Sequence, residues 1–275
     1  MRVAGSRVLV TGAAQGLGFA IAAAFARRGA AVVLTDLNAD RLADAVARLA
    51  AGGFAACGYP LDVTDPRQVA EARARLLADH GPPDVVVNNA GVVFGGPFLD
   101  VPLASHLATV GVNFSGVLAV THAFLPDLLA RPAAHLVNVA SASAVVALPM
   151  AASYAATKAA VLAFSDSLRE ELRELGRRDV GVTAVCPSLI ATGLFGGANP
   201  PRLTRWLTPE RVADAVVRAV EKKNRGTVIL PWTVRWMYRL CAGWPAGAYR
   251  AVCRALGVSR CMADWHGHTP PKGTA

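Results

Sequence analysis

The chain of 275 residues has few cysteines, and they follow no pattern typical of metal sites or disulfides. Their number is odd, none belongs to a C-x-x-C pair, and none has a histidine at the spacing of metal ligands. The five thiols are Cys57, Cys186, Cys241, Cys253 and Cys261. We therefore expect no metal site and no disulfide framework, and we interpret the thiols as buried or idle.

The sequence also lacks a long uninterrupted apolar run. Residues 8–25 follow basic residues and superficially resemble a secretory signal, but Gly12, Gly16 and Gly18 interrupt them with the spacing of a phosphate-binding turn. No apolar stretch reaches the roughly 20 residues that a membrane-spanning helix needs. We therefore expect a cytoplasmic protein.

Acidic residues are scarce in the last third of the chain. Residues 1–201 carry 15 basic and 15 acidic side chains, whereas residues 202–275 carry 13 basic and 4 acidic ones, which accounts for the whole net charge of +9. Residues 231–262 contain no aspartate or glutamate and hold three of the five tryptophans. A segment this basic and aromatic requires an explanation in terms of a partner or of packing.

Two pairs of arginines in this segment indicate amphipathic helices. Arg235 and Arg239 lie one helical turn apart among apolar residues, and Arg250 and Arg254 repeat the pattern. We predict two short helices divided near residues 243–245. They either pack as a lid or a subunit contact, or lie on an anionic membrane surface, where Trp, Tyr and basic residues are favoured. Nucleic acid is disfavoured, because the aromatic residues accompany an apolar face instead of a polar groove.

Strand-like and helix-like segments alternate along the rest of the chain. We predict strands at residues 7–11, 31–36, 55–62, 84–88, 135–140, 181–186 and 227–230. We predict helices at residues 16–28, 42–51, 66–79, 105–129, 153–175 and 209–221. This order predicts an α/β fold with a doubly wound, mostly parallel seven-stranded sheet over residues 1–230, followed by a C-terminal helical extension over residues 231–275. Ligands of such sheets bind at the carboxyl ends of the strands.

A glycine-rich turn joins the first predicted strand to the first predicted helix. The segment Thr11-Gly-Ala-Ala-Gln-Gly-Leu-Gly18 lets the backbone approach a pyrophosphate at the positive N-terminus of the helix. A glycine-rich string is weak alone, and its position between a strand and a helix strengthens the interpretation. The turn residues that we assign to cofactor binding are Gly12, Gln15, Gly16, Leu17 and Gly18.

Asp36 ends the second predicted strand. Its carboxylate can accept hydrogen bonds from the adenosine ribose hydroxyls and would repel a 2′-phosphate. Gln15 offers no positive charge within the turn, and Arg41 lies inside the following helix. We therefore expect NAD over NADP as the cofactor, although an aspartate at a strand end could also cap a turn.

Tyr154 and Lys158 are four residues apart in a predicted helix, so both project from the same face. The chain has only four tyrosines and four lysines, so a chance surface pair at this spacing is uncommon. A phenol beside a cation should have a pKa below its usual value of about 10, as a proton donor and acceptor for an alcohol oxygen requires. Ser141, with Ser143 as an alternative, could hold the substrate oxygen, and Asn113 could hold a water or simply pack as a polar residue.

Together these residues resemble the short-chain dehydrogenase/reductase family. The match runs from residue 7 to about residue 230. It consists of Thr-Gly-x3-Gly-x-Gly at 11–18, Asn88-Asn89-Ala90-Gly91, Asn113, Ser141, Tyr154-x3-Lys158, and Pro187 with Thr192. Ordered motifs at consistent intervals are highly specific. One departure is Ser188, where the family usually has glycine after the proline.

The resemblance implies a Rossmann fold and a role for each matching residue. Tyr154 would be the catalytic acid and base, and Lys158 would lower its pKa and hold the nicotinamide ribose. Ser141 would position the carbonyl, and Asn113 would complete a proton relay. The other residues implied in cofactor binding are Asp62, Val63, Asn89, Ala90, Gly91, Pro187, Ile190 and Thr192. Members of the family commonly form dimers or tetramers, so a homodimer or homotetramer is expected.

The region after the sixth predicted strand looks most like the branch of this family that contains retinol dehydrogenases and 17β-hydroxysteroid dehydrogenases. The apolar residues that we expect to form the substrate pocket are Pro149, Met150, Leu194, Phe195, Leu203 and Trp206. These side chains could equally belong to the core, and if they line a pocket the substrate is lipophilic.

Three functional hypotheses follow. The first is an NAD-dependent dehydrogenase of a lipophilic alcohol. The second is a reductase of an acyl thioester or a small diketone, which would more naturally use NADP. The third is a non-catalytic dinucleotide-binding protein, which we would expect to lack the Tyr or the Lys.

Overall fold

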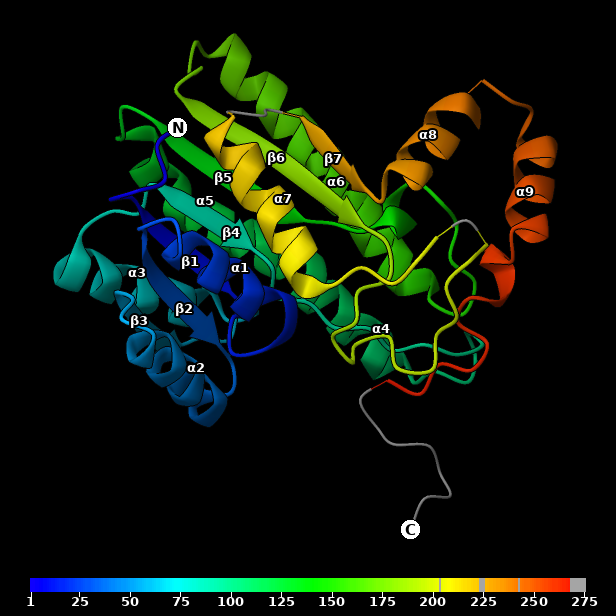
Figure 1. Cartoon of the computed structure of the whole chain (residues 1–275), viewed down its shortest axis with the longest axis horizontal. Coiled ribbons are helices and arrows are strands. Elements are labelled where there is room, and N and C mark those ends of the chain that lie inside the picture. Colours follow the sequence, from blue (N-terminus) through cyan, green and yellow to red (C-terminus); the bar gives the residue numbers. More distant parts are fainter. Residues whose placement is uncertain (203, 223–225, 242, 268–275) are drawn as a thin grey trace.

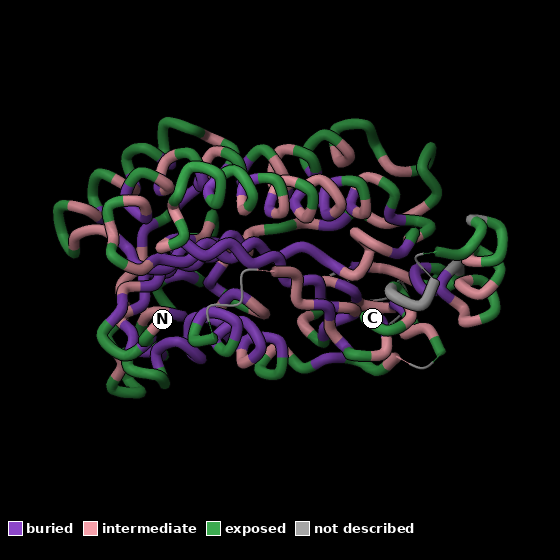
Figure 2. Tube along the Cα trace, turned by 90° about the horizontal axis from the view of Figure 1, so that it is seen from above, coloured by how far each residue is buried: buried purple, intermediate pink, exposed green. Residues whose placement is uncertain are grey.

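The computed structural model describes residues 1–202, 204–222, 226–241 and 243–267, apart from the side chains of residues 239–241, 246 and 259. A central sheet is flanked by helices (Figure 1). Seen from above, the sheet is a buried layer, and the helices beside it turn their exposed sides outward (Figure 2).

Seven parallel strands form the sheet in the order β3-β2-β1-β4-β5-β6-β7. They are β1 (Arg7–Thr11), β2 (Ala31–Asp36), β3 (Ala56–Pro60), β4 (Val85–Asn88), β5 (Ala134–Val139), β6 (Val180–Pro187) and β7 (Thr227–Leu230). The predicted doubly wound sheet is confirmed, and its strand ends differ from the prediction by at most two residues. Strand order reverses between β1 and β4, so the chain leaves these two strands in opposite directions and opens a crevice at their carboxyl ends.

Helices cover both faces of the sheet. One face carries α1 (Gly16–Ala26), α2 (Ala39–Ala51) and α7 (Pro209–Glu221), and the other carries α3 (Pro66–His80), α5 (Gly116–Leu129) and α6 (Ala152–Glu174), with α4 (Leu103–Val110) beside α6. Because side chains alternate along a strand, Val8 and Val10 of β1 pack with Phe25 of α1, whereas Leu9 packs with Phe124 of α5. The sheet therefore has a separate apolar core on each face.

A π-helical turn, Gly111–Ser115, joins α4 to α5. The single helix predicted at residues 105–129 thus has nearly the observed extent but lacks this wider turn. The turn contains Asn113, whose side chain is fully buried. Gly116 follows it, and a Cβ at that position would lie only 2.7 Å from Cγ2 of Val63. The start of α5 therefore lies directly against the loop that follows β3.

Among the described residues, the segment Leu103–Leu129 is the one helix long and apolar enough to cross a membrane, by length and composition alone. Core helices pass the same test, and this one packs Val120, Phe124 and Leu128 against the sheet. Its outward side chains include Leu103, Leu107, Val110 and Leu118. The helix is therefore a layer of the fold that also presents an apolar outer face.

The chain beyond β7 forms two short helices, α8 (Trp232–Cys241) and α9 (Ala246–Ala255), as predicted. They extend beyond β7 at the end of the molecule far from α2 and α3 (Figure 1). The following residues return to the carboxyl edge of the sheet, where the carbonyl oxygen of Cys261 accepts a hydrogen bond from the Asn199 N–H at 2.8 Å. The division of the chain into two parts at residue 230 stays a prediction.

The core placement of Phe124 can be tested by truncation. This ring is 1% exposed, so Phe124→Ala should lower the free energy of unfolding by about 3–5 kcal/mol through lost burial and a residual cavity. Leu175→Ala, at a side chain 66% exposed after the end of α6, is the matched control and should change it by less than about 0.5 kcal/mol. Denaturant unfolding measures both, and equal effects would contradict the described core.

Candidate active site

The glycine-rich turn between β1 and α1 forms one end of a large cavity at the carboxyl edge of the sheet. Gly12 and Gly16 have φ of 61° and 56°, which favour glycine. A Cβ at Gly12 would lie 2.8 Å from the Cα of Ala90. The side chain of Gln15 does not cap α1, and its Oε1 instead accepts a hydrogen bond from Arg41 Nη1 at 3.0 Å. The first N–H groups of α1 therefore remain suited to an anion.

Hydrogen bonds lock the end of β1 to the segment after β4. Thr11 Oγ1 accepts from the N–H groups of Asn89 and Ala90 at 3.0 and 3.1 Å. Asn89 Nδ2 donates to the carbonyl oxygens of Thr11 and Gly12, both at 3.0 Å. A Cβ at Gly18 would overlap the Gly12 oxygen and lie 2.6 Å from Asn89 Nδ2. The three elements can meet only because position 18 has no side chain.

Asp36 lies at the end of β2, on the wall of the same cavity. Its Oδ2 accepts from the Ala14 N–H and its Oδ1 from the Asn38 N–H, both at 3.0 Å. These bonds fix the carboxylate beside the phosphate turn. Arg41 lines the cavity too, so the structure places both an acidic and a basic side chain at this end. Arg41 was not expected at this site, because it lies in a helix.

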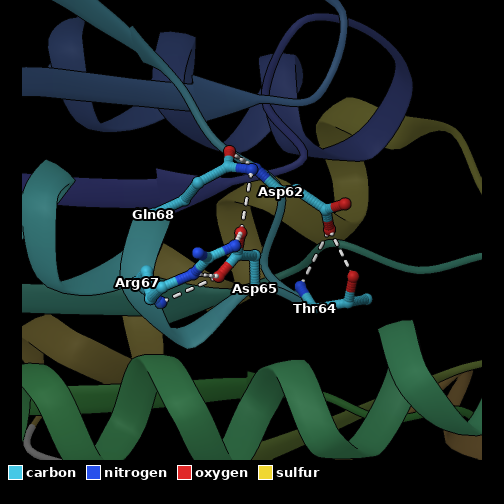
Figure 3. Close-up of polar contacts among 5 residues, drawn as sticks. All are labelled: Asp62, Thr64, Asp65, Arg67 and Gln68. Carbon is cyan, nitrogen blue, oxygen red and sulfur yellow. Dashed lines mark hydrogen bonds and ion pairs between the residues drawn. The ribbon is translucent and has the colours of Figure 1, made fainter.

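The loop after β3 contributes Asp62 and Val63 to the cavity. Asp62 Oδ1 accepts from both the N–H and the hydroxyl of Thr64, at 2.9 and 2.7 Å, and the Asp62 N–H donates to Gln68 Oε1 at 3.1 Å (Figure 3). Asp65 caps α3 by accepting from the Arg67 N–H at 2.9 Å, and this bond lowers the pKa of Asp65 below its usual range. The Asp62 carboxylate therefore shapes its own loop.

Tyr154 and Lys158 lie one turn apart on α6, and both side chains are buried. Lys158 Nζ donates to the carbonyl oxygen of Val139, the last residue of β5, at 2.8 Å. The Tyr154 ring meets the Phe195 ring edge to face, with centroids 5.8 Å apart. Ser141 begins the turn after β5, where its Oγ accepts from the Ser143 N–H at 3.1 Å. The predicted Tyr, Lys and Ser thus come together at the carboxyl end of β5.

Burial controls the protonation of this group. It raises the pKa of Tyr154 to about 12, although a hydrogen bond with Ser141 opposes the rise, and it lowers the pKa of Lys158 to about 8. The prediction of a Tyr154 pKa below 10 is therefore wrong for the protein alone. Desolvation destabilises the Tyr154 phenolate by more than the hydrogen bond with Ser141 stabilises it. The same desolvation disfavours the charged form of Lys158.

Asn113 fastens the chain beyond β4 to this group. Its Oδ1 accepts from the Val92 N–H at 2.8 Å, and its Nδ2 donates to the Val92 carbonyl and to Thr157 Oγ1 at 2.9 and 3.2 Å. A Cβ at Gly91 would lie 3.3 Å from Asn113 Oδ1 and 3.6 Å from Lys158 Nζ. The amide therefore has a positioning role, and its part in a proton relay stays a prediction.

The large cavity measures about 500 Å³ and runs from Asp36 to Tyr154. All the residues that we assigned to cofactor binding line it: Gly12, Gln15, Gly16, Leu17, Gly18, Asp36, Asp62, Val63, Asn89, Ala90, Gly91, Tyr154, Lys158, Pro187, Ile190 and Thr192. Backbone N–H groups at one end and a carboxylate beside them fit a dinucleotide. The described residues contain no cluster of three His, Cys, Asp or Glu side chains that could hold a metal ion.

A second cavity of about 70 Å³ shares Ser141, Ser188 and Phe195 with the first. Phe195 is the expected pocket residue that lines it, and Leu194 lines the larger cavity instead. Pro149, Met150 and Trp206 line neither cavity, and Leu203 lies outside the described residues. The prediction that Pro149, Met150 and Trp206 line the pocket is therefore wrong.

Most of the wall of this second cavity was not predicted from sequence. Residues 146–148 supply one side, and the C-terminal segment supplies Val234, Met237, Leu256, Val258 and Cys261. The apolar face of the two predicted helices was the available signal, but sequence does not say what such a face covers. The distant segments meet only in the folded chain.

The same C-terminal segment also forms hydrogen bonds with the loop after β6. Trp265 Nε1 donates to the Leu194 carbonyl at 3.1 Å, and the His266 N–H donates to the Gly196 carbonyl at 3.0 Å. On the other side, a Cβ at Gly95 would lie 2.8 Å from the Trp265 ring. Trp265 therefore holds together the loops that follow β4 and β6, beside the junction of the two cavities.

The cysteines that the structure describes have no disulfide partner. Cys186 and Cys261 are buried, and burial raises the pKa of their thiols to about 12 and about 11. Neither is a thiolate near neutral pH, so neither can act as a nucleophile there. This agrees with the interpretation of idle thiols.

The chain is similar to known proteins in family, sequence and structure. Residues 6–202 match the family model described as short chain dehydrogenase. The 1-deoxy-11-beta-hydroxypentalenate dehydrogenase of Streptomyces avermitilis is 41% identical over 227 residues, covering 80% of this chain and 83% of that protein. Human epidermal retinol dehydrogenase 2 is 33% identical over 264 residues, covering 94% and 85%. The "Probable oxidoreductase EphD" of Mycobacterium tuberculosis is 39% identical over 237 residues, which is 79% of this chain but 40% of the length of that relative.

Solved structures share the fold. A short-chain dehydrogenase/reductase from Burkholderia phymatum in complex with NAD superposes with a TM-score of 0.80 at 28% identity, covering 88% of this chain and 94% of that one. A gluconate 5-dehydrogenase from Burkholderia cenocepacia in complex with NADP and tartrate gives 0.76 at 27% identity, covering 83% and 95%. The family model alone spans well over half of the chain. The chain belongs to the short-chain dehydrogenase family.

Proposed function

We propose that this chain is a nicotinamide-dependent oxidoreductase that interconverts an alcohol and a carbonyl compound, with Tyr154 as the group that transfers the proton. The observation that carries the proposal is that Tyr154 and Lys158 line the large cavity beside Ser141, which lines both cavities. A non-catalytic dinucleotide-binding protein would have no need of this buried group.

The chemistry assigned to the protein is proton transfer at one oxygen. In alcohol oxidation, the Tyr154 phenolate takes the proton of the hydroxyl group, and in carbonyl reduction the Tyr154 phenol returns a proton to the carbonyl oxygen. Ser141, which is within hydrogen-bonding reach of Tyr154, holds the same substrate oxygen. A bound nicotinamide ring supplies the hydride chemistry at carbon. Lys158 stabilises the phenolate and holds the nicotinamide ribose.

Asp36 supports NAD as the preferred cofactor. Its fixed carboxylate can accept the ribose hydroxyls and would repel a 2′-phosphate. Arg41 acts in the opposite sense, since its guanidinium at the same end of the cavity could neutralise that phosphate. The preference for NAD therefore depends on whether Asp36 repels the 2′-phosphate of NADP more strongly than Arg41 attracts it.

A lipophilic substrate is supported by the second cavity. Its walls are mainly apolar side chains, and one buried hydroxyl, Ser143 Oγ, has no hydrogen-bond partner among the described residues. Such a wall suits an apolar body with a single polar group. Two relatives are named for a retinol and for 1-deoxy-11-beta-hydroxypentalenate, which agrees with this class. A panel of retinoids, steroids, long-chain alcohols and small diols tests it, and preference for the diols would contradict it.

The alternative is reduction of an acyl thioester or a small diketone. A relative in Nostoc named ketoacyl reductase HetN is 32% identical over 228 residues, and Arg41 would accommodate NADP. Turnover of an acetoacetyl thioester or of diacetyl with NADPH is the measurement that separates the two. Faster turnover of these compounds than of lipophilic alcohols would favour the alternative.

The apolar outer face of α4 and α5 supports assembly into a homodimer or homotetramer. Leu103 and Leu107 are 71% and 61% exposed on this face. Exposed apolar patches of this kind are typical of subunit contacts. A cytoplasmic location and the absence of a nucleic-acid partner stay predictions.

The role of Tyr154 is tested by removing one oxygen atom. Tyr154→Phe keeps the ring against Phe195 but cannot transfer a proton, so kcat should fall by about 10²- to 10⁴-fold while NADH binding stays within about twofold. Tyr238→Phe, at a ring 40% exposed on α8, is the matched control. Retention of more than a tenth of kcat by Tyr154→Phe would sink the assignment.

The pH dependence should differ between the two directions. Because burial raises the Tyr154 pKa to about 12, the phenol stays protonated near neutral pH. Reduction needs the phenol, so its kcat/KM should stay constant near neutral pH. Oxidation needs the phenolate, so its kcat/KM should increase as the pH rises. Lys158, with a pKa lowered to about 8, should add an inflection there that is absent in Lys158→Met. Parallel profiles for the two directions would contradict this assignment.

Cofactor preference is tested at the two charges. Asp36→Ala removes the repulsion of a 2′-phosphate and should raise the NADP:NAD ratio of kcat/KM by about tenfold, whereas Arg41→Ala should lower it. Asp40→Ala, in the first turn of α2, is the control for a loss of one negative charge nearby. An unchanged ratio in Asp36→Ala would show that another residue reads the ribose.

A further inference from the structure

Helices α8 and α9 present two chemically different sides. The inward side chains Val234, Met237 and Leu256 line the second cavity. Tyr249 joins α9 to the loop after β5, with its hydroxyl donating to the Val145 carbonyl at 3.2 Å. The two helices and the residue after them therefore act as the outer wall of the proposed substrate site.

The outward side is aromatic and basic. Trp232, Trp236 and Trp244 are 61%, 47% and 49% exposed, which is unusual for so many indole rings in one short stretch. Arg235 lies beside the two tryptophans of α8, and Arg250 and Arg254 are exposed on α9. We call Arg235, Arg250 and Arg254 the basic face of this extension.

Acidic residues of the same segment do not balance this face. Residues 231–262 contain no aspartate or glutamate. Within the described ranges, none of Arg235, Arg250 and Arg254 forms an ion pair. The complement of such a surface is a negatively charged one.

We propose that α8 and α9 dock the protein on the surface of an anionic lipid bilayer. The arginines require a partner that is negative over the length of both helices, and the half-exposed indoles require an apolar layer directly behind that charge. A bilayer with anionic headgroups offers both, because indole rings and basic side chains favour the interfacial layer. An RNA groove offers charge without a continuous apolar layer. Trp and Arg are also enriched at protein interfaces, so a second copy of the chain is the alternative that the measurements below separate from a bilayer.

Docking at this surface would affect how a substrate enters the second cavity. This part of the inference rests on the proposed function. The second cavity measures about 70 Å³, whereas sites for drug-sized ligands occupy roughly 300–1,000 Å³. A large lipophilic substrate must therefore displace part of the wall, and the wall is the docked element. Binding to the bilayer would place the moving wall in contact with the phase in which such a substrate is dissolved.

Vesicle co-sedimentation of the full chain, without cofactor or substrate, tests the docking directly. Vesicles of phosphatidylcholine with phosphatidylglycerol should bind the protein at least about tenfold more tightly than phosphatidylcholine alone, and about 0.5 M salt should abolish the difference. Trp fluorescence should shift to shorter wavelength on the anionic vesicles as the exposed indoles leave water. Equal binding to neutral and anionic vesicles, or no binding, would overturn the proposal.

Matched charge reversals locate the surface. Arg235→Glu with Arg250→Glu and Arg254→Glu should weaken binding to anionic vesicles at least about tenfold. Arg27→Glu with Arg173→Glu and Arg211→Glu reverses three exposed arginines elsewhere and should change it less than about threefold. Equal losses in both variants would show a general charge effect and reject the assigned face. Should the first variant fail to fold, Trp232→Ser with Trp236→Ser serves instead and should lose the fluorescence shift.

A separate measurement keeps this proposal distinct from the catalytic one. NADH binding and turnover of a short water-soluble alcohol should stay within about threefold in the α8 and α9 variants. Normal turnover without vesicle binding in the wild type would overturn docking alone, whereas vesicle binding without turnover of any alcohol would overturn the proposed function alone. If the wild type self-associates through this face in gel filtration and does not bind vesicles, the face is instead a contact between two copies of the chain.

Discussion

The active-site arrangement depends on one close approach, between the turn after β1 and the segment after β4. The Cα of Ala90 lies only 2.8 Å from where a Cβ of Gly12 would be, and Asn89 bridges the carbonyl groups of Thr11 and Gly12. These strands flank the point at which strand order reverses, so their separation sets the width of the crevice. A side chain at position 12 or 18 would force the two sides apart and carry the phosphate turn away from the segment that Asn113 holds.

Desolvation governs the chemistry at the other end of the crevice. Burial raises the pKa of Tyr154 to about 12 and lowers that of Lys158 to about 8, so the two groups lie further apart in proton affinity than they do in water, and the phenol moves toward the higher pKa of an alcohol. A proton can then move between substrate oxygen and phenol with a smaller difference in energy. The Val139 carbonyl holds the lysine in place even when it is neutral, because an amine can still donate a hydrogen bond.

Sequence was sufficient for the features that local patterns encode. The run Val85 to Val87 predicted a strand buried on both faces, and the spacing of Tyr154 and Lys158 predicted a shared helical face. Features that depend on distant segments were not accessible. No pattern near Arg41 indicated its bond to Gln15, no pattern predicted the π turn at Asn113, and the expected Tyr154 pKa omitted a burial that only the fold creates. Trp206 and Met150 were expected in the pocket for their apolarity, whereas distant residues such as Val258 form its wall.

Part of the wall of the second cavity comes from a different stretch of the chain than the reacting groups. Tyr154, Lys158 and Ser141 lie in the first two hundred residues, whereas Met237, Leu256 and Cys261 come from the last fifty. Selection can therefore alter the tail without touching the atoms that carry the proton. A gene duplication followed by divergence of the tail would yield sister enzymes with a common reaction and different substrates, and grafting such tails onto one body is a direct route to redesigned selectivity.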